Sequence, residues 1–298
     1  MKCFSEAQVK ELLSVEDCIG VLRRAFSMEF TNIPRYRLKS ENSLLHVMSA
    51  SIPALGVMGL KAYGTSKNGG NFAVLLFEET SGSLLAVFEA DALGQIRTGA
   101  ASGLATDLLA NQDARVGAVI GTGYQAETQL LAIDAVREFR EIRVFSRSAD
   151  GRRAFLDSVR KKARAPLVEV GSAEECAREA DVICTITSSK EPVLRGKWLK
   201  PGCHINAAGV NWANRRELDE AAIQRSDMIV VDHLEQSKRE SGDLIAISGF
   251  DWTRVIELSD VVRRKIPRFS KDQITLFKSN GIAMEDVAAA HYVLSRSM

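Results

Sequence analysis

Apolar residues change their spacing near residue 30, from a helical to a strand-like pattern. In residues 5–30 they recur at the spacing of one helical face. This face consists of Val9, Leu12, Leu13, Cys18, Val21, Leu22 and Phe26. From about residue 33 to 90 they form short or alternating runs with turn residues between them, at 44–48, 56–63, 72–77 and 84–89. The pattern predicts a helical segment followed by an antiparallel or mixed sheet.

After Ala114 short apolar runs alternate with helical patterns. The predicted strands are 116–120, 142–145, 167–170, 182–187, 204–208 and 228–231. The helices between them include 125–139, 152–162, 173–179 and 217–225. This alternation is typical of a parallel, doubly wound sheet with helices on both faces.

The chain therefore predicts an α/β fold with two domains, a number that agrees with its 298 residues. Residues 113–271 are expected to form a Rossmann-type, doubly wound domain, and residues 1–112 an α+β domain. Residues 272–298 show a helical pattern interrupted near Asn280. We expect this segment to pack on the N-terminal sheet, which would make the first domain discontinuous.

The net charge, the apolar runs and the cysteines limit which binding partners and which cellular location we expect. Lys and Arg number 39 against 38 Asp and Glu, so the formal net charge is +1, which argues against a nucleic-acid partner. No apolar run approaches the roughly 18–20 residues of a membrane span, and Glu6 stands where a signal peptide would begin its apolar core. Five scattered cysteines without a C-x-x-C pair are typical of reduced thiols. We expect a cytoplasmic protein that binds neither nucleic acid nor a membrane. Its His and Cys residues show no metal-ligand spacing, so we expect no bound metal.

A glycine-rich turn joins the first strand of the second domain to its first helix. It runs Gly121, Thr122, Gly123, Tyr124, Gln125, Ala126. In this strand–turn–helix context Gly121 permits the tight turn, Gly123 lets a pyrophosphate approach the backbone, and Ala126 allows close helix–sheet packing. The motif predicts a dinucleotide site, and the alternative is a glycine-rich turn without a ligand.

The end of the next strand distinguishes the two nicotinamide cofactors. An acid there would bind the ribose 2′-hydroxyl of NAD. The sequence instead has Ser146, Arg147 and Ser148, with no acid before Asp150. An arginine between two hydroxyls suits a 2′-phosphate, so NADP(H) is favoured over NAD(H), unless Arg147 is only a solvated loop residue.

Four cationic residues of the first domain stand in unusual settings. Lys61 interrupts an apolar strand, Arg35 and Arg37 lie two apart after a proline, and Arg97 precedes a run of small residues that begins with Thr98, a candidate helix N-cap. An arginine fork binds a carboxylate bidentately, and a lysine near other cations can act as an acid or base. The alternatives are an edge-strand lysine and paired surface arginines.

These residues give the chain a resemblance to the ornithine cyclodeaminase/μ-crystallin family along essentially its whole length. The matching stretches are Pro34-Arg35, Leu45-His-Val-Met48, Gly59-Leu-Lys61, Gly94-Gln-Ile-Arg97-Thr-Gly-Ala-Ala-Ser102, Gly121-Thr-Gly-Tyr-Gln-Ala126, Asn206-Ala-Ala-Gly209, Glu217-Leu-Asp219, Phe277-Lys-Ser-Asn-Gly-Ile-Ala283 and Glu285-Asp286. The arginine segment and the last stretches are specific to the family, whereas the glycine-rich turn is not.

The resemblance implies a homodimer in which each subunit pairs a Rossmann domain with a substrate and dimerisation domain. It implies that Arg35, rather than Arg37, and Arg97 bind the substrate carboxylate and that Lys61 is the catalytic lysine. The residues implied to contact the cofactor are Arg97, Thr98, Gly121, Thr122, Gly123, Tyr124, Gln125, Ala126, Ser146, Arg147, Ser148, Thr185, Thr187, Val210 and Ser279.

One departure from the family pattern bears on the reaction. Ornithine cyclodeaminases carry an Asp where this sequence has Asn211, and an amide cannot take up a proton at neutral pH. With Asn211 orienting the substrate, the resemblance implies NAD(P)H-dependent reduction of a cyclic ketimine or an α-imino or α-keto acid, such as Δ1-pyrroline-2-carboxylate or Δ1-piperideine-2-carboxylate. The alternatives are ornithine cyclodeaminase, an alanine-, arginine- or opine-type dehydrogenase, and a non-enzymatic binding protein.

Overall fold

The computed structural model describes residues 1–297, which form two compact units. The N-terminal unit comprises Met1–Arg97 and the segment from Gly281 onward, and the Rossmann unit comprises Thr98–Asn280. The predicted boundaries lay at residues 112 and 272. The first unit is thus built from two separate segments of the chain, and its second segment begins later than residue 272.

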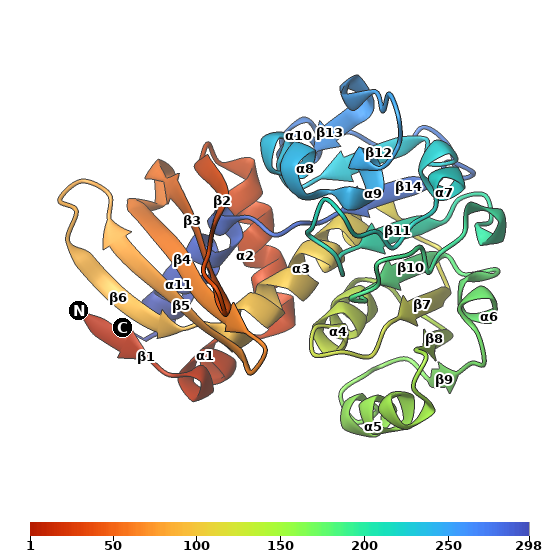
Figure 1. Cartoon of the computed structure of the whole chain (residues 1–298), viewed down its shortest axis with the longest axis horizontal. Helices are drawn as coiled ribbons and strands as arrows, with labels where there is room; N and C mark the ends of the chain where they lie inside the picture. The colour runs from red at the N-terminus through yellow and green to blue at the C-terminus, as the bar shows by residue number, and fades with distance from the viewer. Residues whose placement is uncertain (298) are drawn as a thin grey trace. The chain divides into compact units, whose positions relative to one another are not determined.

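A mixed six-stranded sheet is the centre of the N-terminal unit (Figure 1). Its strand order is β1-β6-β5-β4-β3-β2, antiparallel throughout except for the parallel β1–β6 pair. The strands are β1 (Lys2–Phe4), β2 (Thr31–Lys39), β3 (Ser43–Ile52), β4 (Val57–Ser66), β5 (Gly69–Glu78) and β6 (Leu84–Glu89). The four runs predicted between residues 44 and 89 correspond to β3–β6, whereas no separate run was predicted for β1 or β2.

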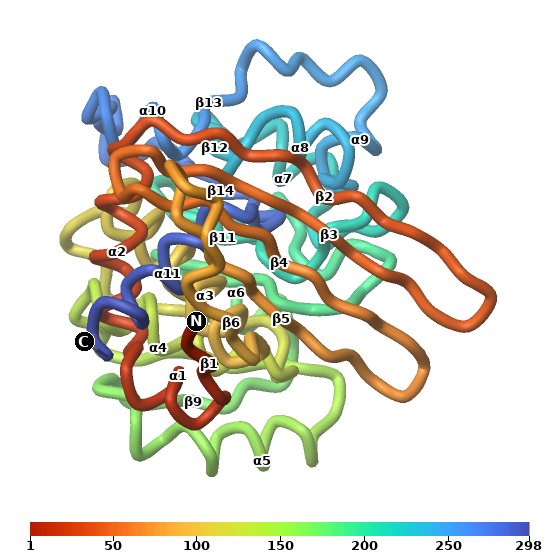
Figure 2. Tube along the Cα trace, turned by 90° about the vertical axis from the view of Figure 1, so that its left-hand side faces the viewer, coloured from red at the N-terminus to blue at the C-terminus, as the bar shows by residue number. Residues whose placement is uncertain are grey.

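Helices α1 (Glu6–Leu12), α2 (Val15–Ser27) and α11 (Ala283–Arg296) belong to the same unit. Ser5 and Ser14 begin the first two helices, because their hydroxyls accept main-chain N–H groups of the first turn. Helix α11 packs against β3, β4 and β5 and against α2, and it lies beside them in both views (Figures 1 and 2). Most of its residues are buried, so this helix covers one face of the sheet.

Helix α3 (Asp91–Leu109) begins earlier than predicted. The sequence suggested a start at Thr98 with its hydroxyl as the N-cap, but Thr98 lies in the middle of the helix. The carboxylate of Glu6 accepts the N–H groups of Asp91 and Ala92, both at 2.7 Å, and so satisfies the first turn. Because the capping group lies 85 residues away in sequence, the local pattern did not show it.

The Rossmann unit contains an eight-stranded parallel sheet, which confirms the predicted fold class. The strand order is β13-β12-β14-β11-β10-β7-β8-β9. The strands are β7 (Val116–Ile120), β8 (Glu141–Phe145), β9 (Leu167–Glu169), β10 (Val182–Thr185), β11 (His204–Ala207), β12 (Met228–Val231), β13 (Val255–Glu257) and β14 (Thr275–Lys278). The prediction of helix from residue 272 was wrong at β14, a buried strand too short for its apolar residues to show a period.

Helices lie on both sides of this sheet. They are α4 (Ala126–Val136), α5 (Ala149–Val159), α6 (Ala173–Ala177), α7 (Glu220–Gln224), α8 (Leu234–Glu240), α9 (Gly242–Ile245) and α10 (Leu258–Arg264), with short 3-10 turns η1 (Pro53–Leu55), η2 (Gly196–Trp198) and η3 (Trp252–Arg254) elsewhere in the chain. Alternate residues of β7 enter different cores, Ala118 and Ile120 on one side and Val119 on the other. Burial on both faces is the signature of a doubly wound sheet.

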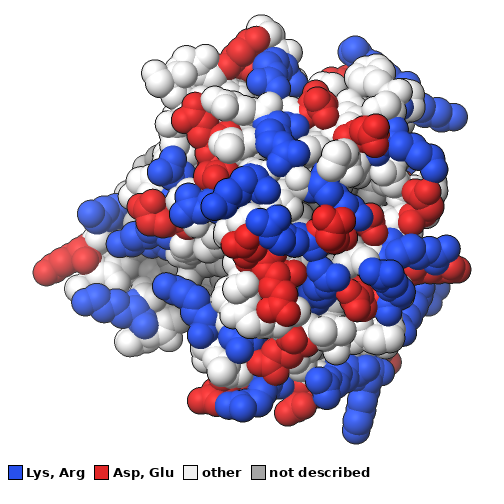
Figure 3. Space-filling view, turned by 90° about the vertical axis from the view of Figure 1, so that its right-hand side faces the viewer, with Lys and Arg blue, Asp and Glu red and all other residues white. Residues whose placement is uncertain are grey.

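The surface and the thiols add two observations. Lys and Arg side chains are interspersed with Asp and Glu side chains on the face drawn in Figure 3. Within residues 1–297, no helix is both long and apolar enough to cross a membrane. All five cysteines are free thiols, and only Cys3 is exposed.

Candidate active site

Lys61 lies on β4 with its side chain turned toward α11. It is 3 % exposed, and its ammonium group donates a hydrogen bond to Oδ1 of Asp286 at 2.8 Å. Space for this group is provided by Gly94 in α3, where an added Cβ would lie 2.6 Å from Lys61 Nζ. The glycine of the Gly94–Arg97 stretch therefore has a steric role, because any larger residue would displace the lysine.

Arg97 reaches the same carboxylate from α3. Its Nε donates to Asp286 Oδ1 at 3.1 Å and its Nη1 donates to Glu285 Oε2 at 2.8 Å. The guanidinium lies against Gly281, where a Cβ would come within 2.5 Å of Nη1 and where φ is +72°. Only glycine meets both requirements without strain.

Arg35 of β2 joins this cluster through the main chain. It is buried, and its Nη2 donates to the carbonyl oxygen of Gly281 at 2.9 Å. Three predicted residues, Arg35, Lys61 and Arg97, thus gather at the segment that leads into α11. Arg37, the alternative to Arg35, is half-buried on the same strand.

Asp286 and Glu285 are the residues that sequence reasoning missed, although both were quoted within a matching stretch. Burial by itself raises the pKa of Asp286, but Arg97 and Lys61 outweigh it and lower the pKa overall. The sequence held only an indirect signal for these two acids. Three cations buried in one domain need acidic partners, and an acidic pair stands at the start of the last helix.

Burial lowers the pKa of Lys61 to about 8, with Asp286 opposing this change and Arg97 adding to it. A lysine whose pKa lies near neutrality can donate a proton and be reprotonated at physiological pH. Lys61 is therefore suited to acid–base chemistry, whereas an ordinary surface lysine is not.

A row of stacked aromatic rings lies next to Lys61 on β3, β4 and β5. The centroids of His46 and Tyr63 are 4.2 Å apart, and those of Tyr63 and Phe72 are 5.0 Å apart. Lys61 Nζ lies 6.0 Å from the Tyr63 centroid and 5.7 Å from that of Phe72. Burial, with Arg37 and Arg35 nearby, lowers the pKa of His46 to about 4, so this ring is neutral at pH 7. The surroundings of the lysine are thus apolar and aromatic on one side.

The predicted glycine-rich turn joins β7 to α4 in the Rossmann unit. Gly121 has φ +119°, and a Cβ there would lie 2.2 Å from the carbonyl oxygen of Ile186, so glycine is required. Around Gly123 there is open space, as the approach of a phosphate to the backbone needs. Thr122 donates to the Ser146 hydroxyl at 2.8 Å and ties the turn to the end of β8. The turn fits a dinucleotide pyrophosphate.

Other predicted cofactor residues follow the carboxyl ends of neighbouring strands. Ser148 caps α5 by accepting the Gly151 N–H at 3.0 Å, and Arg147 beside it is exposed. Thr185 ends β10 and Thr187 follows it, Val210 follows β11 together with Asn211, which was predicted to orient the substrate, and Ser279 follows β14, where its hydroxyl donates to Asp232 at 3.3 Å. Tyr124 is 52 % exposed, and Gln125 precedes the first residue of α4. In parallel sheets this edge is where ligands bind.

The structure overturns the helix start expected at Thr98, and it gives Arg97 partners that the sequence did not show. Thr98 is inside α3, with its carbonyl oxygen accepting from Gln129 at 3.1 Å. Arg97, predicted for both substrate and cofactor, uses its guanidinium for Glu285 and Asp286. Within residues 1–297, no group of three His, Cys, Asp or Glu side chains is arranged to hold a metal ion.

The fold and the glycine-rich turn define a Rossmann-type dinucleotide-binding protein joined to a lysine-containing α+β unit. A family model described as "Ornithine cyclodeaminase/mu-crystallin family" matches residues 2–298. The chain belongs to this family, as its sequence motifs predicted.

Three similar proteins place it more closely. It is 37 % identical to ketimine reductase mu-crystallin of Rattus norvegicus over 221 residues, which cover 74 % of this chain and 68 % of that protein. The structure of Thermococcus litoralis Δ1-pyrroline-2-carboxylate reductase in complex with NADH and L-proline is similar, with TM-score 0.93, 29 % identity and coverage of 100 % of this chain and 97 % of that chain. An archaeal alanine dehydrogenase dimer with bound NAD gives TM-score 0.91 at 29 % identity, covering 99 % and 95 %.

The ion pairs of Asp286 predict a large effect on stability. Replacing Asp286 by Asn leaves Lys61 and Arg97 buried beside a neutral amide, which should lower the free energy of unfolding by about 3–5 kcal/mol. Denaturant unfolding followed by circular dichroism measures this change. As a control, the same replacement at Asp157, exposed on α5, should stay within about 0.5 kcal/mol. Equal stability of the two variants would show that the buried carboxylate does not hold the unit together.

Proposed function

We propose that this protein is an NAD(P)H-dependent reductase that converts a cyclic ketimine carrying a carboxylate into the corresponding L-amino acid. Δ1-Pyrroline-2-carboxylate and Δ1-piperideine-2-carboxylate are the leading substrates. The observation that carries the proposal is the buried cluster of Arg35, Lys61 and Arg97 with Glu285 and Asp286. Two relatives with reductase names, the rat and Thermococcus proteins, support the same class.

The charge of the cluster suits one carboxylate. Three cations face two acids, so these five side chains together carry one positive charge in excess. A substrate carboxylate bound by Arg35 and Arg97 would neutralise it, and the two guanidinium groups would fix the substrate's orientation. Arg97 need not lose Glu285 and Asp286 of α11, nor Arg35 the carbonyl oxygen of Gly281, because each guanidinium has several N–H donors.

Lys61 would supply the proton that the reaction requires. Reduction of a C=N bond adds a hydride to carbon and a proton to nitrogen, and the electron pair of the π bond becomes the new N–H bond. A reduced nicotinamide bound at the carboxyl edge of the parallel sheet would supply the hydride. The ammonium group of Lys61 would protonate the imine nitrogen and be reprotonated from solvent, a cycle that its lowered pKa favours.

The surroundings of Lys61 suit a substrate with an apolar ring better than one with a second cationic amine, such as ornithine. Tyr63 and Phe72 present aromatic rings within about 6 Å of its ammonium group, and the neutral ring of His46 stacks on Tyr63. Such rings pack against the methylene groups of a five- or six-membered cyclic imine. Asn211 can orient the ring by hydrogen bonding but cannot deprotonate an ornithine side-chain amine. Both features support reduction over cyclodeamination.

The proposed cofactor preference is NADP(H), with NAD(H) as the alternative. Arg147 is exposed at the end of β8 between two serines, where a 2′-phosphate would lie. The Thermococcus and archaeal relatives are described with NADH and NAD. The pyrophosphate would bind at the turn 121–126 and at the N-terminus of α4.

The proposal includes a homodimer formed through the six-stranded sheet. Helix α11 covers one face of this sheet, and alternate residues point to the other face. That face has an open groove of about 440 Å³ lined mainly by apolar side chains, among them Ile33, Met58, Leu60 and Phe77. Ile33 is 55 % exposed, and burying such a face would stabilise a dimer, the state named for the archaeal relative. Location in the cytoplasm, suggested by the scattered cysteines, stays a prediction.

The reaction can be tested directly with purified protein. Δ1-Pyrroline-2-carboxylate or Δ1-piperideine-2-carboxylate should cause NADPH oxidation, measured by absorbance at 340 nm. Lys61 must be protonated, so kcat/KM should be full below its pKa of about 8 and fall as the pH rises through that value. Lys61→Met should reduce kcat by at least about 100-fold, whereas Lys161→Met, at an exposed position, should not. Ammonia release from L-ornithine without imine reduction would overturn the proposal, and NADPH binding without turnover would indicate a binding protein.

The cofactor preference predicts a selective effect at Arg147. Replacing Arg147 by Ala removes a charge-assisted contact with a 2′-phosphate, so the KM for NADPH should rise about 10-fold or more while the KM for NADH stays within about 2-fold. Steady-state kinetics with both cofactors give the comparison. Arg160→Ala, also exposed and close in sequence, is the control. Equal changes for NADPH and NADH would contradict a role in 2′-phosphate binding.

The dimer predicts a mass of twice 32.6 kDa in solution. Leu60→Glu places a charge in the apolar groove and should give a monomer, as measured by light scattering after size-exclusion chromatography. Val168→Glu makes the same change at a partly exposed strand position of the Rossmann unit and should leave the dimer intact. A monomeric wild-type protein, or dissociation by both variants, would exclude this interface.

A further inference from the structure

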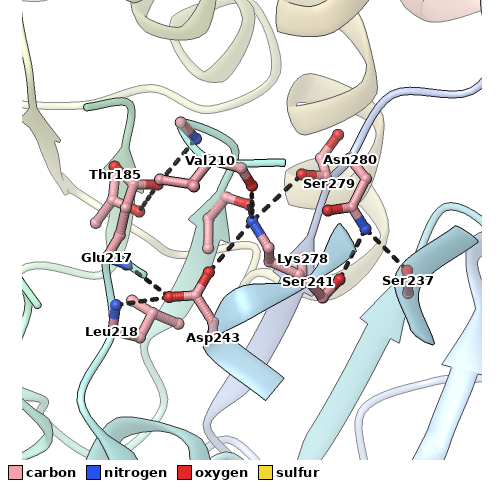
Figure 4. A network of polar contacts seen from close by, with 12 residues as sticks. Thr185, Val210, Glu217, Leu218, Ser237, Ser241, Asp243, Lys278, Ser279 and Asn280 are labelled. Atoms are coloured by element: carbon pink, nitrogen blue, oxygen red, sulfur yellow. Dashed lines mark hydrogen bonds and ion pairs between the residues drawn. The ribbon is translucent and has the colours of Figure 1, made fainter. Parts of the chain in front are cut away.

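A second charged cluster is buried in the Rossmann unit and has no part in the proposed chemistry. It consists of Glu217, which precedes α7, Asp243 in α9 and Lys278 at the end of β14 (Figure 4). Their exposed fractions are 0 %, 2 % and 0 %. Lys278 and Asp243 form an ion pair at 3.3 Å.

The carboxylate of Glu217 joins two loops. Its Oε1 accepts the main-chain N–H of Thr187 at 2.6 Å and the Thr187 hydroxyl at 2.7 Å. Its Oε2 accepts the Thr185 hydroxyl at 3.0 Å and the N–H of Gly209 at 2.8 Å. The loop after β10 is therefore tied to the loop after β11. All donors point at the carboxylate, so an ionised glutamate fits where an amide does not.

Asp243 and Lys278 extend this network, Asp243 by holding Glu217 and Lys278 by holding the loop after β11. Asp243 Oδ1 accepts the N–H groups of Glu217 and Leu218 at 2.6 and 2.8 Å, which fixes Glu217 itself. Lys278 donates to the carbonyl oxygens of Ala207 and Val210 at 3.3 and 2.5 Å. The segment 207–210 is thus bound at both ends and at Gly209, and it has little freedom to move.

Burying these three charged groups costs free energy, so fold stability alone does not explain the cluster. Burial raises the pKa of Glu217, as does Asp243, while Lys278 opposes them. Two buried carboxylates share one lysine, and burial of charges contributes little net stability compared with apolar packing. Its hydrogen bonds instead define the geometry of three loops, those after β10, β11 and β14.

These loops begin at the carboxyl ends of strands that are neighbours in the sheet, β10, β11 and β14. The loops and strand ends carry Thr185, Thr187, Val210 and Ser279, which the family resemblance implies contact the cofactor, Val210 and Ser279 near the nicotinamide. They lie on the other side of β7 from β8, where the adenine ribose would bind. We propose that Glu217 is a positioning residue which, through Asp243 and Lys278, holds these loops in the conformation that receives the nicotinamide half of the dinucleotide. This inference rests on the proposed oxidoreductase function.

The test replaces Glu217 by Gln and separates the two halves of the cofactor. In either orientation of the amide, its NH₂ group faces the N–H of Thr187 or of Gly209, so one loop must move. Calorimetric titration with NADPH and with adenosine 2′,5′-bisphosphate, which lacks the nicotinamide half, measures both sites. We expect kcat/KM and NADPH affinity to fall about 10- to 100-fold, as for lost hydrogen bonds to a charged group. Affinity for the bisphosphate should stay within about 2-fold.

Asp134→Asn is the matched control. Asp134 is a buried acid at the end of α4 that also accepts main-chain N–H groups, from Arg164 and Ala165 at 2.6 and 3.4 Å. It precedes the amino end of β8, on the other edge of the sheet, so its loss should leave the ratio of the two affinities unchanged. A similar change of this ratio in both variants would reduce Glu217 to a general structural role and overturn the inference.

Two further outcomes keep the inference and the proposed function distinct. A wild-type protein that binds neither NADPH nor the bisphosphate refutes the dinucleotide site itself. Unchanged turnover in Glu217→Gln, with NADPH bound normally, refutes only the positioning role. If the variant does not fold, amide hydrogen exchange in the wild-type protein tests whether the two loops are already held before cofactor binds. The amides of Thr187 and Gly209 should exchange as slowly as the core strands before cofactor is added, and rapid exchange would overturn the inference.

Discussion

The N-terminal unit depends on one carboxylate, that of Asp286, which is buried between Lys61 and Arg97. Charges interact strongly where water is excluded. The carboxylate of Asp286 therefore offsets much of the free-energy cost of burying two cations between the sheet and α11. These ion pairs also need space. A Cβ atom at position 94 would overlap the ammonium group of Lys61, and one at position 281 would overlap the guanidinium of Arg97, so both positions are glycine. The register of α11 on the sheet, the two glycines and the buried lysine are thus one set of mutually dependent features.

The two units divide the requirements of a hydride-transfer reaction between them. The N-terminal unit offers excess positive charge for a carboxylate and a lysine with a lowered pKa. The Rossmann unit offers a glycine-rich turn and the carboxyl edge of a parallel sheet. In both units the functional side chains are held by buried acids, Asp286 in one and Glu217 with Asp243 in the other.

Sequence patterns predicted what depends on local order. The parallel strands β7 and β12 lie where short apolar runs placed them, and the glycine-rich turn shows the expected φ at Gly121. Lys61 and Arg97 could be found because a charge in an apolar or small-residue run is out of place. Their partner Asp286 had only an indirect signal, since it lies 225 residues from Lys61 in the chain. The start of α3 was misplaced for the same reason, because Glu6 caps it from a distance.

The segment between Lys278 and Asp286 has a consequence for biosynthesis. Within nine residues it carries the lysine that pairs with Asp243 and the carboxylate that pairs with Lys61 and Arg97. A ribosome makes this segment after Lys61, Arg97, Glu217 and Asp243, so both charged centres are incomplete until it emerges. Before that point Lys61 and Arg97 lack Asp286, and Asp243 lacks Lys278 together with the central strand β14 that carries it. Final folding of both units therefore awaits the same short stretch of polypeptide, which couples their completion in time.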